Sequence, residues 1–183
     1  EFPWNKEPYY SQDYRYLDAY EAGWRIVKSN LGSSKIAGID PHGGIDEEQF
    51  RETVHELSAR GIFPEIFTIK IFVDSTHQMM GERTFQSGSD YLYARQFIEK
   101  IRGILEEEGQ TYQMCISEWS NSLSNRNIVQ DSCARGTYII KFILSIWKTA
   151  DMIGFWHGSD AVDIFYDSRK LIYGGGGLLT KDG

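Results

Sequence analysis

The chain has 183 residues, of which 41% are hydrophobic and 25% charged, and a formal net charge of −7 at pH 7. This length and composition are typical of a single globular domain with its own hydrophobic core. The sequence contains no run of about 18 apolar residues, so we expect no membrane span. Because an acidic surface repels phosphate backbones, we expect no direct nucleic-acid contact by this segment.

Helix-like and strand-like patterns alternate along the chain. Apolar residues that recur every three or four positions predict helices, and short runs rich in Ile, Phe and Val predict buried strands. A glycine follows two of the helix patterns, at Gly61 and Gly109, where glycine commonly ends a helix. Helices are predicted at 13–30, 46–60, 90–108 and 131–148, and strands at 1–5, 35–40, 62–73, 112–118 and 152–157.

This order of elements predicts an α/β fold with a parallel sheet. Helix-length connections between buried strands favour right-handed βαβ units. Two architectures fit the pattern, an open doubly wound sheet and a barrel, and length and pattern do not separate them. A complete (β/α)8 barrel needs about 250 residues, so five strands would form only part of one.

Polar and aromatic residues gather where three of the predicted strands end. In parallel α/β folds this edge of the sheet carries the ligand site. Two carboxylic acids and aromatic faces suit the cleavage of a glycosidic bond, because one acid protonates the leaving oxygen while the other attacks or activates water. The alternative is that Glu118 and Asp160 only make structural hydrogen bonds. The residues concerned are Asn5, Glu7, Glu118, Trp119, Trp156 and Asp160.

Four segments resemble motifs of the family 39 glycoside hydrolases, the β-xylosidase and α-L-iduronidase group. Segment 116–120 (Ile-Ser-Glu-Trp-Ser) resembles the strand end that carries the family's nucleophile. Segment 155–160 (Phe-Trp-His-Gly-Ser-Asp) resembles the last strand end, and 175–179 (Gly-Gly-Gly-Leu-Leu) a glycine-rich segment. Segment 4–8 (Trp-Asn-Lys-Glu-Pro) resembles the acid/base motif. The resemblance covers residues 1–183 as one domain and implies strands four to eight of a (β/α)8 TIM barrel.

The resemblance also implies a retaining mechanism without a cofactor or a metal. Glu118 would be the nucleophile and Glu7 the acid/base, acting on β-xylosides or related glycosides. Asn5 would bond the 2-hydroxyl of the sugar. The remaining implied substrate contacts are Trp119, Trp156 as the floor of the sugar site, and Asp160.

Two departures from the family pattern put catalysis in question. Lys6 stands directly after Asn5, so Glu7 is the acid only if one residue is inserted; otherwise Lys6 replaces it. Ile71 and Val73 are placed by the resemblance where the family has His and Tyr. The alternative function is therefore a sugar-binding or sensing barrel, such as the effector domain of an AraC-like bacterial transcription regulator.

The remaining features bear on surroundings and partners. Two cysteines, Cys115 and Cys133, do not make a disulfide framework, which favours a reducing compartment and a cytoplasmic location. The chain begins without methionine or a signal peptide, so we expect a processed start or a piece of a longer protein. The expected partners are a sugar or oligosaccharide and the N-terminal half of the barrel.

Overall fold

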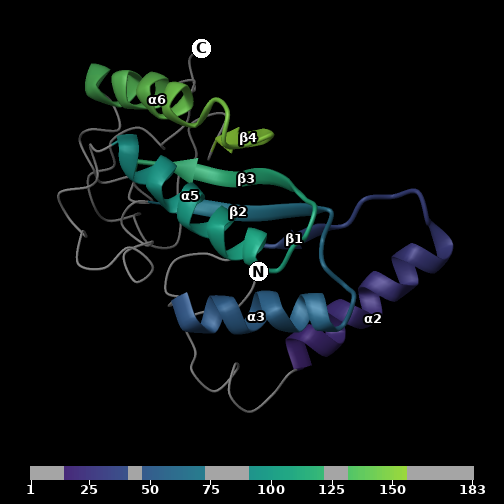
Figure 1. Cartoon of the computed structure of the whole chain (residues 1–183). Helices are drawn as coiled ribbons and strands as arrows, with labels where there is room; N and C mark the ends of the chain where they lie inside the picture. The colour runs from purple at the N-terminus through teal and green to yellow at the C-terminus, as the bar shows by residue number, and fades with distance from the viewer. Residues whose placement is uncertain (1–14, 41–46, 73–90, 122–131, 156–183) are drawn as a thin grey trace, which may run out of the picture.

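In the computed structural model, the described residues form four helices and four strands, which alternate along the chain (Figure 1). The structure describes residues 15–40, 47–72, 91–121 and 132–155. In chain order the elements are α2 (Arg15–Asn30), β1 (Ala37–Ile39), α3 (Glu47–Ala59), β2 (Ile66–Phe72), α5 (Tyr91–Glu107), β3 (Gln113–Ser120), α6 (Cys133–Ile146) and β4 (Met152–Phe155).

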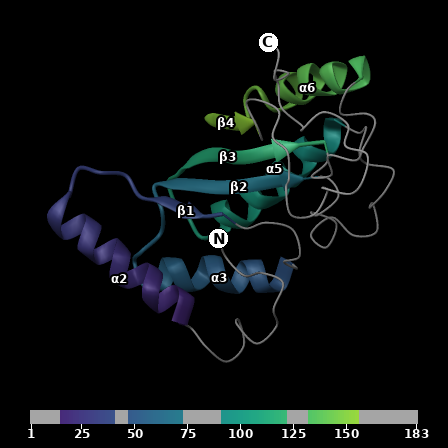
Figure 2. The same ribbon diagram turned by 180° about the vertical axis from the view of Figure 1, so that it is seen from behind.

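The four described strands form one sheet in the order β1-β2-β3-β4, and every neighbouring pair is parallel. Sequential order is what right-handed βαβ connections produce when each strand is added beside the last. The α5 helix lies in front of the sheet in Figure 1 and behind it in Figure 2, so it covers one face. The predicted parallel α/β sheet is confirmed.

The hydrophobic core fills the space between the sheet and its helices. Every second residue of β2 (Phe67, Ile69 and Ile71) is fully buried, as expected when alternate side chains point to one face. Phe67 meets Phe50 of α3 edge to face, with ring centroids 6.0 Å apart. Further core residues lie on α5 and α6, at Phe97, Ile98, Ile101, Ile104, Leu105, Tyr138, Phe142 and Ile146.

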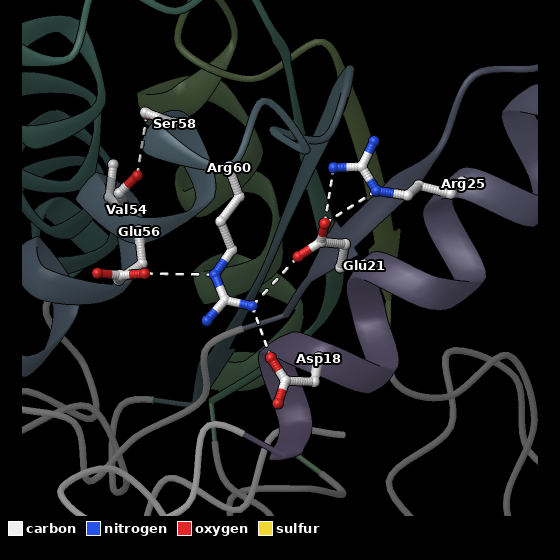
Figure 3. Close-up of polar contacts among 7 residues, drawn as sticks. All are labelled: Asp18, Glu21, Arg25, Val54, Glu56, Ser58 and Arg60. Carbon is white, nitrogen blue, oxygen red and sulfur yellow. Dashed lines mark hydrogen bonds and ion pairs between the residues drawn. The ribbon is translucent and has the colours of Figure 1, made fainter.

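Arg60 joins the end of α3 to α2, as Figure 3 shows. Its Nη1 atom lies 2.7 Å from Oδ1 of Asp18 and 3.2 Å from Oε2 of Glu21, both on α2. Its Nε atom lies 3.3 Å from Oε2 of Glu56 on α3. These carboxylates hold the guanidinium and raise its pKa, although partial burial opposes that shift. These ion pairs link the residue after α3 to two residues of α2.

The predicted elements agree with the structure apart from their ends. The two helix-stopping glycines are confirmed, since Gly61 and Gly109 have φ values of 67° and 63°, which L-residues with side chains seldom adopt. Strand β2 starts at Ile66 rather than at 62. Strand β3 continues two residues past Glu118, so the prediction that Glu118 ends it is wrong. The expected strand at 1–5 lies outside the described residues.

None of the four described helices combines the length and the apolar character that crossing a bilayer requires.

Candidate active site

A β-bulge in β3 shapes the candidate site. Ile116 pairs with Ile69 of β2, but the next pair joins Glu118 to Lys70, so Ser117 is an extra residue on β3. The pairing with β4 shows the same excess, because Ile116 pairs with Ile153 and Trp119 with Phe155. Bulges of this kind are common next to active sites, where they redirect a side chain.

The bulge decides which face of the sheet Glu118 occupies. Met114 and Ile116 point into the helix-covered core, and strict alternation would send Glu118 to that same core face. One inserted residue reverses the alternation. Trp119 therefore enters the core, and Glu118 lies beside Lys70 on the opposite face.

Glu118 belongs to a charged cluster with Lys70 and Asp40, the residue that follows β1. The Nζ atom of Lys70 lies 3.2 Å from Oε1 of Glu118 and 3.4 Å from Oδ2 of Asp40. The Lys70 side chain is 4% exposed, whereas the two carboxylates are about a quarter exposed. Burying an ammonium group costs free energy unless opposite charges surround it, and here two carboxylates supply them.

Asp40 is held in place from both its backbone and its side chain. Its φ of 59° lies in the left-handed region, where Asp and Asn are the least strained residues after glycine. Its Oδ1 atom accepts a hydrogen bond of 2.6 Å from Oγ of Ser117, and the same hydroxyl lies 3.2 Å from the carbonyl oxygen of Ile69. The bulged residue therefore links the backbone of β2 to the carboxylate that faces Lys70.

The Asp40 carboxylate affects the pKa of two neighbouring neutral groups, the Tyr16 hydroxyl and the Cys115 thiol. Burial raises the pKa of the Tyr16 hydroxyl, and the nearby Asp40 carboxylate raises it further. The same two causes raise the pKa of the Cys115 thiol. Both groups therefore stay neutral at pH 7, so the described charges in this part of the sheet are those of Asp40, Lys70 and Glu118.

The predicted substrate residue Trp119 lies in the core rather than at an open site. Its side chain is 1% exposed and stacks on Phe142 of α6, with ring centroids 3.8 Å apart and planes 2° apart. Phe155 of β4 meets the same ring edge to face. Its surface is occupied by packing, so we assign it a structural role.

The other predicted site residues, Asn5, Glu7, Trp156 and Asp160, lie outside the described residues, as do Lys6 and Val73. The structure describes Ile71, one of the two positions where the resemblance places an aliphatic residue instead of a polar one. Ile71 is fully buried on the core face. The β2 residue that pairs with Glu118 is Lys70, so this position is polar.

Sequence reasoning missed Asp40, Lys70 and Ser117. Lys70 carries a signal in the sequence, since a lysine in the middle of a buried Ile- and Phe-rich strand requires a partner of opposite charge. Asp40 follows an apolar strand, and this position commonly carries functional groups in parallel sheets. Ser117 carried no signal, because the bulge that selects it is a property of strand pairing.

Comparison with known proteins finds glycosidases of similar fold. No protein-family model and no curated protein sequence matches the chain. Solved structures do. A glucosidase from Croceicoccus marinus is similar with a TM-score of 0.60 and 16% identity, over 76% of this chain and 27% of that chain.

Two further solved structures are similar to this chain over more of its length than the glucosidase is. A monomeric β-xylosidase from Caulobacter crescentus CB15 is similar over 98% of this chain and 37% of its own, with a TM-score of 0.68 and 17% identity. The GH39 enzyme from Xanthomonas axonopodis pv. citri is similar over 92% and 33%, with a TM-score of 0.67 and 15% identity. The resemblance to family 39 glycoside hydrolases is therefore confirmed at the level of the fold, and the chain spans about a third of the length of these proteins.

Among the described residues, no three His, Cys, Asp or Glu side chains gather in a way that suits a metal ion.

Proposed function

We propose that this chain is part of a retaining glycoside hydrolase that acts on β-xylosides or related glycosides, with Glu118 as the nucleophile. The observation that carries the proposal is the position of Glu118. A bulge directs this carboxylate away from the core, and the side chain is about a quarter exposed beside a buried cation. The fold shared with β-xylosidases supports the same function.

In the proposed reaction, a Glu118 oxygen attacks the anomeric carbon and forms an ester bond while the glycosidic carbon–oxygen bond breaks. The acid/base residue donates its proton to the departing oxygen. A water molecule then attacks the anomeric carbon, its proton returns to the acid/base residue, and the Glu118 carboxylate is released. Glu7 is our candidate acid/base, on the strength of its sequence motif, with Asn5, Trp156 and Asp160 as sugar contacts.

We propose further that the sheet belongs to a (β/α)8 barrel that a longer protein completes. The strands follow one another in sequence order, whereas a doubly wound sheet reverses its order at a switch point. In the described part of the chain β1 and β4 each have an unpaired edge, and such edges are normally covered or paired.

The outer face of α6 supports the same proposal. Ile140, Ile143, Leu144 and Trp147 form an exposed apolar stripe, and Trp147 is 72% exposed. Met152 and Ile153 of the edge strand β4 are also exposed. Contiguous apolar surface of this kind marks an interface. We assign it to a neighbouring βα unit of the same barrel, which makes the rest of the barrel the partner of this segment.

Hydrolysis of an aryl β-xyloside by the full-length protein tests the function. We expect release of the aryl group by the parent protein, and loss of at least about 10²-fold in kcat/KM for Glu118→Ala. Glu108→Ala is the matched control, because Glu108 lies at the end of α5 and pairs with His55 at 3.2 Å, away from the cluster. Activity that survives Glu118→Ala would refute the nucleophile.

The alternative, a sugar-binding or sensing barrel, gives a different result in the same experiment. A parent protein that binds xylose or a xylo-oligosaccharide in calorimetry but releases no aryl group would favour it. The cluster does not exclude binding, because carboxylates and an ammonium group also bond sugar hydroxyls.

A further inference from the structure

Lys70 contacts the proposed nucleophile from the neighbouring strand β2. Strand pairing sets Lys70 directly opposite Glu118, and its ammonium group lies 3.2 Å from Oε1. With 4% of its side chain exposed, the ammonium group has little access to solvent that could replace this contact. The ion pair involves Oε1 of Glu118, and we take the second oxygen, Oε2, as the attacking atom.

A second carboxylate restrains Lys70 in turn. Oδ2 of Asp40 lies 3.4 Å from the ammonium nitrogen, and Oδ1 of Asp40 accepts the hydrogen bond from Ser117. Ser117 is the bulged residue next to Glu118 in the chain. The contacts therefore form a closed network from Glu118 through Lys70 and Asp40 back to Ser117. This network restrains Glu118 through its carboxylate and through the backbone of the residue before it.

We infer that Lys70 is a positioning residue for the Glu118 nucleophile, and that Asp40 holds Lys70 for this task. The inference rests on the proposed function and deepens it. Lys70 acts through Glu118: it occupies one carboxylate oxygen and directs the other toward the anomeric carbon. The position of a reacting carboxylate matters for the rate, because a misplacement of about 1 Å can cost about 10²-fold.

The test is chemical rescue in the full-length protein. Lys70→Ala removes the ammonium group and leaves a cavity, and we expect kcat/KM on an aryl β-xyloside to fall by about 10²-fold. Added propylammonium supplies the missing cation in the cavity and should restore a measurable part of kcat, whereas propanol at the same concentration should not. A lysine with a merely structural role would give a loss of stability that the amine does not reverse in kcat.

Two further variants keep the test decisive. Lys70→Met keeps most of the length of the side chain without its charge, and it replaces Lys70→Ala should the cavity prevent folding. Lys100→Ala is the matched control, since Lys100 pairs with Glu47 at 2.7 Å between α5 and α3, away from the cluster. We expect parent-like kcat/KM for the control and a loss of about 10²-fold for Lys70→Met.

Folded Lys70→Ala or Lys70→Met protein with the kcat/KM of the parent would overturn the inference. So would a loss that propylammonium leaves unchanged while circular dichroism and the unfolding temperature of Lys70→Ala match the parent. A failure of the proposed function has a separate signature: the parent protein does not cleave the glycoside, or Glu118→Ala cleaves it as well as the parent does.

Discussion

Gly154 of β4 lies against the bulged backbone of β3, and the absence of a side chain there permits the close approach. A Cβ atom at this position would lie 2.6 Å from the carbonyl oxygen of Ser117, below the 3.0 Å that real Cβ contacts keep. The neighbour is backbone, so it cannot rotate away. Gly154→Ala must therefore displace β3 or β4 at the residue before Glu118.

We expect Gly154→Ala to destabilise the protein by about 1–3 kcal/mol, the range found when extra methyl groups are forced into packed structure. This exceeds the gain of about 0.5–1 kcal/mol that alanine normally has over glycine in regular secondary structure. For a domain of 150–250 residues, each kcal/mol lowers Tm by about 2–4 °C. Because the displaced backbone carries Glu118, kcat/KM on an aryl β-xyloside should fall as well.

Urea unfolding followed by circular dichroism measures the change, with Gly103→Ala as the matched control. Gly103 lies inside α5, and a Cβ atom there would meet nothing within 4 Å. The control should be about 0.5–1 kcal/mol more stable than the parent. If Gly154→Ala were as stable as this control, the bulge would not depend on close contact with Gly154, and the reasoning would be wrong.

Three further predictions concern the remaining described residues. The first concerns Glu65, whose pKa lies below its usual value of 4.5: burial acts to raise it, but hydrogen bonds from Lys28 and from the Ile36 N–H lower it. The ionised carboxylate therefore stabilises the fold at neutral pH, and this contribution is lost as pH falls through the pKa of the folded state. Glu65→Gln should lower the urea midpoint more at pH 7 than at pH 3, and equal losses at both values would contradict this. Trp119→Ala should cost about 3–5 kcal/mol in unfolding free energy; a stable variant with weakened sugar binding would show that the ring serves the substrate. Since burial and the Asp40 charge raise the pKa of Cys115, a disulfide reagent at pH 7 should label the exposed Cys133 first, and equal labelling rates would refute this.

Several features of this protein follow from the sequence alone. The run rich in Ile, Phe and Val at 62–73 predicts the buried strand, and Phe67, Ile69 and Ile71 of β2 are fully buried. The two glycines that end α3 and α5 are recognisable because few other residues adopt positive φ at low cost. These signals are local, and they depend only on backbone geometry and on which side chains avoid water.

The cluster around Glu118 was decided by tertiary structure. Alternation alone places Glu118 on the same face as Ile116, in the core, and the inserted residue at Ser117 reverses that outcome. This bulge arises from the pairing of β3 with both of its neighbours, so the sequence of β3 alone does not predict it. Lys70, Asp40 and Glu118 are distant in sequence. Only the parallel sheet brings the Lys70 ammonium group within 3.4 Å of both carboxylates. Local chemistry thus specified the elements, whereas the strand register determined which side chains meet.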